Sequence, residues 1–85
     1  MVKKQEYQEL NFTHFVVFTA DGSVFGCAKH DGHIYNFLIK RDEVHRQKGM
    51  GWSKLEADLA EIVRKRAESA SQAVPTYRTD RMEIN

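Results

Sequence analysis

Three side chains in the first half of the chain have the spacing of soft-metal ligands, namely Cys27, His30 and His33. His14 and His45 could complete the four convergent ligands that a structural zinc site needs. Successive side chains of a strand point to opposite faces of its sheet, which separates Cys27 from the two histidines that follow it. We therefore expect no metal site, and we interpret these residues as ordinary hairpin residues at a solvated end of a sheet.

Cys27 is also the one thiol of the chain and hence the one candidate for a nucleophilic cysteine. Such catalysis needs a thiolate that is stabilised by a neighbouring base or cation. The predicted strand pairing instead puts Cys27 between Val16 and Asn36, where a cysteine packs as a small hydrophobic residue. The acidic residues are scattered, and no two of them are placed for acid/base catalysis. We expect the protein not to be an enzyme and to need no cofactor.

The elements that position these side chains follow from two Asp-Gly pairs, Asp21-Gly22 and Asp31-Gly32. An Asp-Gly pair between strand-forming runs is a strong signal for a two-residue hairpin turn. The sequence thus predicts three antiparallel strands, at about residues 12–19, 23–30 and 33–40. We expect an α+β fold of the order β-β-β-α, in which a three-stranded antiparallel meander carries one amphipathic helix.

Two-residue turns also fix the register of the predicted strands. Counting outward from the turns pairs Phe18 with Phe25 and Val16 with Cys27 in the first hairpin, and Phe25 with Leu38 in the second. Both faces of the resulting sheet carry several large apolar residues. An antiparallel sheet with one wet face would instead alternate apolar and polar residues, so each face needs a cover.

Residues 53–73 have the pattern of the helix that supplies one of these covers. Ser53 and Glu56 match a capping box at its start, and Pro75 ends it because the residue before a proline disfavours helical geometry. The apolar residues at helical spacing are Leu55, Leu59, Ile62, Val63, Ala67 and Ala70. We expect this stripe to pack on the face where Gly26 and Ala28 create a shallow trough, with the opposite, equally apolar face as the alternative. The face with the trough carries Phe15, Val17, Tyr35, Phe37 and Ile39.

The chain is expected to form one domain, residues 1–85, with sheet 12–40, connector 41–52, helix 53–73 and tail 74–85. The connector is charged, so we expect it to be the most mobile segment and to form at most one helical turn between Asp42 and Gly49. Both termini are polar and are expected to be partly ordered at best. The chain has no apolar run of membrane-spanning length, no signal peptide and a lone cysteine, so we expect a soluble, cytoplasmic protein.

Basic residues of the connector and the helix could form a rim that neutralises phosphates. They are Lys40, Arg41, Arg46, Lys48, Arg64, Lys65 and Arg66. With this rim the protein would be a small nucleic-acid-binding regulator, which is the alternative function. The net charge of +1, from thirteen basic and twelve acidic residues, neither demands nor excludes such a partner.

A three-stranded sheet backed by a helix, here residues 12–73, resembles in architecture the arm-type DNA-binding domains of tyrosine recombinases. That resemblance implies a sheet that lies in the major groove. The chain departs from it because the more polar sheet face offers only His14, Lys29 and Asn36, whereas a groove-reading face is rich in polar side chains. We expect no appreciable DNA affinity at physiological salt.

One helix covers one sheet face, which leaves an apolar set on the other without a cover. Its members are Phe12, Val16, Phe18, Phe25, Ile34 and Leu38. Exposed together they would form a patch of roughly several hundred Å², larger than soluble monomers usually carry. We therefore expect a two-fold homodimer, with sheet faces or a strand edge at the interface, or a complex with a partner protein.

The function predicted from this patch is that of a small non-enzymatic protein-interaction module. Chains of this size class are frequent among phage and mobile-element accessory proteins, including inhibitors of host defence. One helix and three strands enclose little volume, so no small-molecule substrate is expected.

Overall fold

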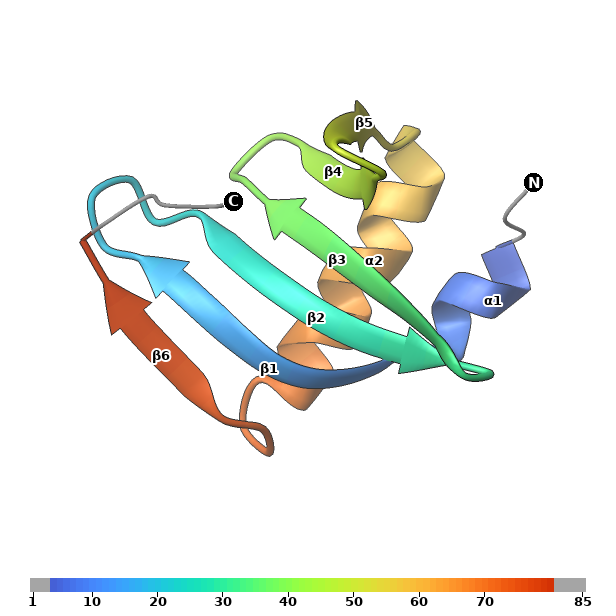
Figure 1. Cartoon of the computed structure of the whole chain (residues 1–85), viewed down its shortest axis with the longest axis horizontal. Helices are drawn as coiled ribbons and strands as arrows, with labels where there is room; N and C mark the ends of the chain where they lie inside the picture. Colours follow the sequence, from blue (N-terminus) through green and yellow to red (C-terminus); the bar gives the residue numbers. More distant parts are fainter. Residues whose placement is uncertain (1–3, 81–85) are drawn as a thin grey trace.

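A computed structural model describes residues 4–80 of the chain. The elements are α1 (Lys4–Gln8), β1 (Asn11–Phe18), β2 (Val24–His30), β3 (His33–Ile39), β4 (Val44–Lys48), β5 (Gly51–Lys54), α2 (Ala57–Ala70) and β6 (Thr76–Thr79). The strands form one six-stranded sheet in the order β5-β4-β3-β2-β1-β6, and α2 crosses one face of it, behind the sheet in Figure 1. The predicted α+β class is confirmed, but the sheet has three strands beyond the predicted meander of β1 to β3.

The extra strands come from segments that we predicted to be irregular. The prediction of an irregular connector at 41–52 is wrong, because this segment contains β4 and the start of β5. Strand β4 pairs with β3 on one side and with β5 on the other. The turn between these two strands contains Gly49 with a φ of +60°, a value that favours glycine. The predicted tail 74–85 is also wrong in part, because β6 pairs in parallel with β1 at the edge of the sheet.

The second hairpin, between β2 and β3, has the predicted register. Its turn residues Asp31 and Gly32 have φ values of +50° and +78°, as a two-residue turn of the favoured twist requires. His30 therefore opposes His33, and Phe25 opposes Leu38.

The first hairpin, between β1 and β2, has a different register from the one predicted. Phe25 opposes Val16 and not Phe18, because the connecting loop is longer than two residues. Gly22 donates its amide to the Phe18 carbonyl at 2.8 Å, which closes this wider loop. The Asp21 carboxylate fixes the loop from inside, since it accepts from both the amide and the hydroxyl of Ser23, at 2.9 and 2.7 Å.

Acid is expected to weaken this loop. The Ser23 hydroxyl, and then its amide, hold the pKa of Asp21 below the ordinary value, so the carboxylate stabilises the fold above its unfolded pKa of about 4 and loses this effect as the pH falls through the folded pKa. Asp21→Asn keeps an acceptor oxygen but does not titrate. We expect the difference in Tm between wild type and this variant to shrink between about pH 6 and about pH 3, measured by circular dichroism. A constant difference would contradict this account.

A bulge near the start of β1 changes which face Phe12 occupies. The register shifts between Phe12, which opposes Ala28, and His14, which opposes Cys27. The intervening Thr13 donates its hydroxyl to the Cys27 carbonyl at 3.3 Å. Because an extra residue reverses the alternation of side chains, Phe12 lies on the α2 side of the sheet, where it is buried.

The core lies between α2 and the sheet face that we predicted for it. Phe37 is fully buried there, together with Val44 of β4 and Val63 of α2. The helix starts later than predicted, at Ala57, because Ser53 belongs to β5. Its N-cap is Glu56, which makes no side-chain capping hydrogen bond, so the predicted capping box is wrong. Among residues 4–80 no helix is long and apolar enough to cross a membrane.

The N-terminal segment completes this core, contrary to the prediction of a partly ordered terminus. Tyr7 of α1 is 1% exposed and Leu10 is fully buried. Arg66 of α2 donates two hydrogen bonds, of 2.7 and 3.2 Å, to the Leu10 carbonyl. Lys4 also pairs with Asp58 near the start of α2, at 2.8 Å. The N-terminal segment is therefore bound to α2 at the first residue of α1, Lys4, and at Leu10, two residues after α1 ends.

Candidate functional site

The sheet face opposite α2, here called the outer face, is the first candidate site. The register assigns to it His14, Val16, Phe25, Cys27, Lys29, Ile34, Asn36, Leu38, His45, Gln47, Trp52, Lys54 and Tyr77. Its central strands contribute apolar side chains that are half-buried or exposed, and Ile34 is 63% exposed. Neither α1 nor α2 packs on this face (Figure 1).

Four of the six residues predicted for the interface lie on the outer face: Val16, Phe25, Ile34 and Leu38. Phe12 does not, because the bulge in β1 turns it under α2. Phe18 has the alternation of the outer face, but only 3% of its surface is exposed. The candidate interface is therefore narrower along β1 than predicted.

Two aromatic residues outside the predicted interface enlarge the outer face. The rings of Trp52 of β5 and Phe25 form a T-shaped contact, at a centroid distance of 6.2 Å and an interplanar angle of 81°. Tyr77 of β6 is 63% exposed and is the register partner of Val16. Trp52 follows a glycine-rich turn and Tyr77 lies two residues after Pro75, so only the alternation within each short strand could have assigned them to a face.

Polar contacts lie beside the apolar part of the outer face. Asn36 donates to the Gln47 side-chain oxygen at 3.1 Å. The Glu43 carboxylate lies 2.9 Å from the His45 ring and 3.3 Å from the Lys54 ammonium. Both contacts hold the pKa of Glu43 below its ordinary value, and the contact with His45 has the larger effect. The charged cluster thus sits at the end of β4 and β5, away from Ile34.

The candidate metal ligands do not converge in the structure. Cys27 lies on the outer face opposite His14, while His30 and His33 face each other beside the β2–β3 turn. Within residues 4–80 no three His, Cys, Asp or Glu side chains form a group that could hold a metal ion. Cys27 is half-buried and is a free thiol.

The seven basic residues of the predicted rim are not gathered on one surface. Arg46 lies on the α2 side of the sheet, with its guanidinium 4.6 Å from the centre of the Tyr35 ring, and Arg66 holds the Leu10 carbonyl. Arg64 donates to the Arg41 carbonyl at 2.8 Å. The others are Lys40 before β4, Lys48 at its far end, and Lys65, which pairs with Glu61 at 3.3 Å. This placement gives no support to a continuous phosphate-binding rim.

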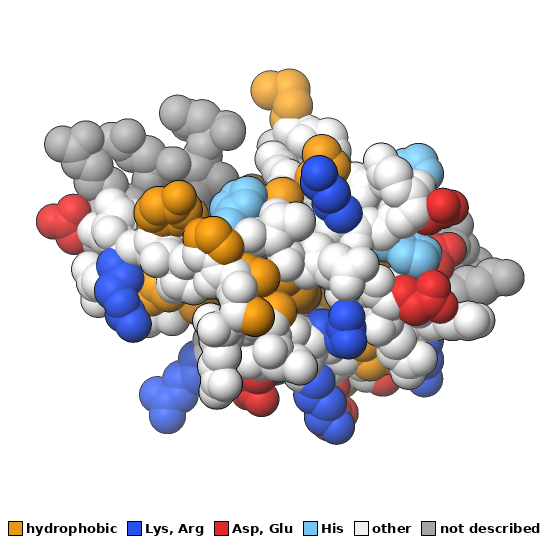
Figure 2. All heavy atoms as spheres, turned by 90° about the horizontal axis from the view of Figure 1, so that it is seen from below, with side chains coloured by type: hydrophobic (Ala, Val, Ile, Leu, Met, Phe, Trp, Pro, Cys, Tyr) orange, Lys and Arg blue, Asp and Glu red, His pale blue; other side chains and the backbone are white. Residues whose placement is uncertain are grey.

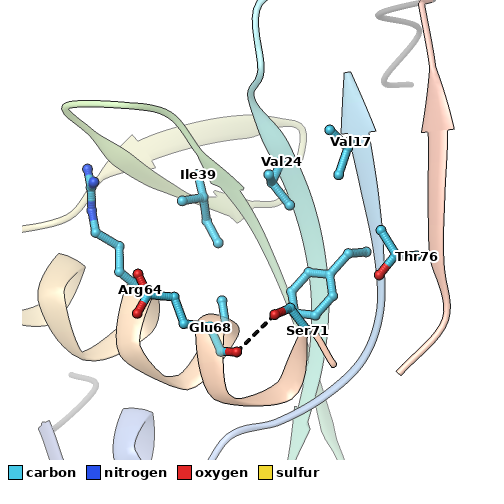
Figure 3. Close-up of a pocket in the computed structure, with 9 residues that line it drawn as sticks. Val17, Val24, Ile39, Arg64, Glu68, Ser71 and Thr76 are labelled. Carbon is cyan, nitrogen blue, oxygen red and sulfur yellow. Dashed lines mark hydrogen bonds between the residues drawn. The ribbon is translucent and has the colours of Figure 1, made fainter. Parts of the chain in front are cut away.

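A groove between α2 and the sheet is the second candidate site (Figure 3). Its volume is about 270 Å³, and its apolar walls are Phe15, Val17, Val24, Ile39 and Ala67. Its polar margin is Arg64, Glu68, Ser71 and Thr76. The helix contributes the small side chain of Ala67 where the sheet contributes larger residues, so this part of the interface is not filled. The extended sheet thus leaves a space that a three-stranded sheet was not expected to enclose.

Apolar atoms reach the surface in more than one place on this molecule. Figure 2 shows hydrophobic side chains across the side seen from below, with Lys and Arg side chains along its lower margin. The outer face and the groove lie on opposite sides of the sheet, so they can be tested separately.

Comparison with protein-family models, with curated proteins and with solved structures finds no match for this chain.

Proposed function

We propose that this protein is a non-enzymatic interaction module that forms a two-fold homodimer through its outer face. The observation that supports the proposal is the apolar centre of that face. Phe25, Leu38 and Val16 lie on neighbouring strands, and the Trp52 ring extends the surface from the far side of β4. Contiguous apolar patches larger than a few hundred Å² on the surface of a soluble protein mark interaction sites.

The outer face is large enough for a dimer. Six strands spaced about 4.8 Å apart, with a rise of about 3.4 Å per residue, give a face of roughly 25 by 20 Å. Such a face buries on the order of 1,000 Å² in total when two copies meet, which is near the lower limit for a specific interface. We therefore expect a weak dimer, with a Kd in the micromolar range.

A second copy is the occupant that the charge distribution favours. A two-fold axis brings the same patch of each copy together, so the residues at its centre must tolerate their own kind. Phe25 and Leu38 satisfy this condition because they are apolar. The Glu43 cluster lies towards one end, where it stays at the solvated margin of such a dimer.

Phe25→Glu is expected to dissociate the dimer. A carboxylate at the centre of the interface would be buried without a partner, which costs about 3 kcal/mol or more and weakens association at least about a hundredfold. The measurement is sedimentation or light scattering over a concentration series. Wild type should approach twice the chain mass of 9.9 kDa, and the variant should stay at that mass.

The matched control is Ser69→Glu, which adds the same charge at an exposed position of α2. Circular dichroism should show that both variants are folded, since Phe25 is only half-buried within one chain. Wild-type protein of about 10 kDa at high micromolar concentration would refute the dimer. Dissociation by both variants alike would refute the choice of face.

A further inference from the structure

The groove under α2 combines an apolar interior with a charged pair at its margin. Phe15, Val24 and Ile39 come from three neighbouring strands and face Ala67 of the helix. Figure 3 shows the Val24 and Ile39 side chains directed into the same space, with Glu68 and Ser71 on the helical side. This interior excludes a highly polar ligand.

The size of the groove limits the ligand to a small molecule. A cavity of about 150 Å³ holds one benzene molecule, and drug-sized ligands need about 300 Å³ or more. The groove, at about 270 Å³, therefore fits a benzyl-sized group with a short polar head.

The charged pair at the margin is Arg64 and Glu68, which are one helical turn apart. In the same helix Glu61 and Lys65 have the same spacing and form an ion pair at 3.3 Å. Arg64 and Glu68 form none within 4.0 Å, although both line the groove. Their order, with the cation nearer the helix N-terminus, is the less favourable one for such a pair. A cation and an anion about one turn apart thus remain available to a ligand.

The other polar groups of the margin are already in use. The Ser71 hydroxyl donates to the Glu68 carbonyl at 2.9 Å, as the dashed line in Figure 3 shows. The Thr76 hydroxyl donates to the Val74 carbonyl at 3.4 Å. Arg64 is positioned by its bond to the Arg41 carbonyl, which uses one of its five N–H donors.

We propose that this groove binds a free apolar α-amino acid. Its side chain fills the space beside Ala67, its carboxylate accepts from Arg64, and its ammonium group donates to Glu68. The zwitterionic head binds both Arg64 and Glu68 at once. A simple acid would bind only Arg64, and a simple amine would bind only Glu68. The binding lies on the opposite side of the sheet from the outer face and does not depend on the dimer.

The test uses three probes with the same ring and different heads: L-phenylalanine, 3-phenylpropionate and phenethylamine. They are titrated into isotope-labelled protein, and binding is followed by NMR shifts of the groove amides. L-Phenylalanine, with about twelve non-hydrogen atoms, should bind with a Kd on the order of 1 mM. The other two probes should bind about fivefold more weakly, because each loses one exposed ionic contact.

Charge variants should separate the two contacts. Arg64→Gln should weaken L-phenylalanine and 3-phenylpropionate about fivefold and leave phenethylamine unchanged, while Glu68→Gln should weaken L-phenylalanine and phenethylamine and not 3-phenylpropionate. The matched controls are Lys65→Gln and Glu61→Gln, which remove the same charges from the paired set and should change nothing.

A steric variant tests the apolar part. Ala67→Leu should fill the groove and remove the shifts for all three probes, while Ser69→Leu, at an exposed site on the same helix, should leave them intact. Phe25→Glu should also bind L-phenylalanine normally, so failure of the dimer would not be mistaken for failure of this site. The proposal is refuted if L-phenylalanine gives no saturable shifts in the groove. It is equally refuted if Arg64→Gln and Glu68→Gln affect the three probes alike.

Discussion

Tyr7→Ala should lower the free energy of unfolding by about 3–4 kcal/mol, which corresponds to a fall in Tm of roughly 15–20 °C for a domain of this size. The Tyr7 ring is almost completely buried and lies edge-on to Tyr35 and Phe37, at centroid distances of 6.3 and 5.7 Å. Removing it opens a cavity beside the most buried aromatic residue of the sheet. The total free energy of unfolding of a native protein is about 5–15 kcal/mol, so this loss is a large share of the stability.

Urea denaturation measured by fluorescence and circular dichroism gives this difference directly. Gln8→Ala is the control, because Gln8 is the next residue of α1 and its side chain is exposed. Tyr7→Phe keeps the ring and should stay within about 1 kcal/mol of wild type. A loss below about 1 kcal/mol for Tyr7→Ala would mean that α1 is not part of the cooperative core.

The importance of this N-terminal segment could not be predicted from its composition. Tyr7 and Leu10 are separated by three positions in a polar stretch, which is too short a pattern to distinguish a helix from a loop. Tertiary contacts hold these two residues in place. Tyr7 fills the space beside Phe37, and the Arg66 guanidinium binds the Leu10 carbonyl. Local sequence carries no information about either partner.

The hairpins show where turn chemistry suffices and where it does not. Asp31 and Gly32 both adopt positive φ, which only a two-residue turn of the favoured kind needs, and the register of β2 and β3 follows. In the first hairpin Asp21 instead binds Ser23, and the loop widens. The Asp-Gly pair therefore predicted the register correctly in the second hairpin and incorrectly in the first. In the first hairpin, a serine two residues after the aspartate hydrogen-bonds to the aspartate side chain, and the two-residue turn does not form.

The candidate sites were predictable to different degrees. The outer face was expected from Val16, Phe25, Ile34 and Leu38, because their alternation survives the change of register by two residues. The contribution of Trp52 depends on β4 and β5. These strands could not be predicted because they lie largely in the charged connector. The groove could not be predicted, since it depends on how α2 lies across the sheet.

Gly26→Ala should lower the free energy of unfolding by about 1–3 kcal/mol, through overpacking of the core. A methyl group at Gly26 would lie 2.8 Å from Cε1 of Phe12 and 3.2 Å from Cδ1 of Phe15. These rings cannot easily withdraw, because they are buried and stacked on each other at 5.1 Å. Gly51→Ala is the control, since its methyl group would meet nothing closer than 4.0 Å, and it should change stability by less than about 0.5 kcal/mol.

A double variant decides whether the bulge in β1 is the cause. Sequence alternation identified the trough at Gly26 but assigned Phe12 to the other face, and the structure fills the trough with Phe12 because of the register shift before His14. If that is correct, Phe12→Leu should relieve the clash, and the double variant should be less destabilised than the sum of the two single variants, by about 1 kcal/mol. Strict additivity in urea denaturation would place Phe12 away from Gly26 and would restore the regular alternation of β1.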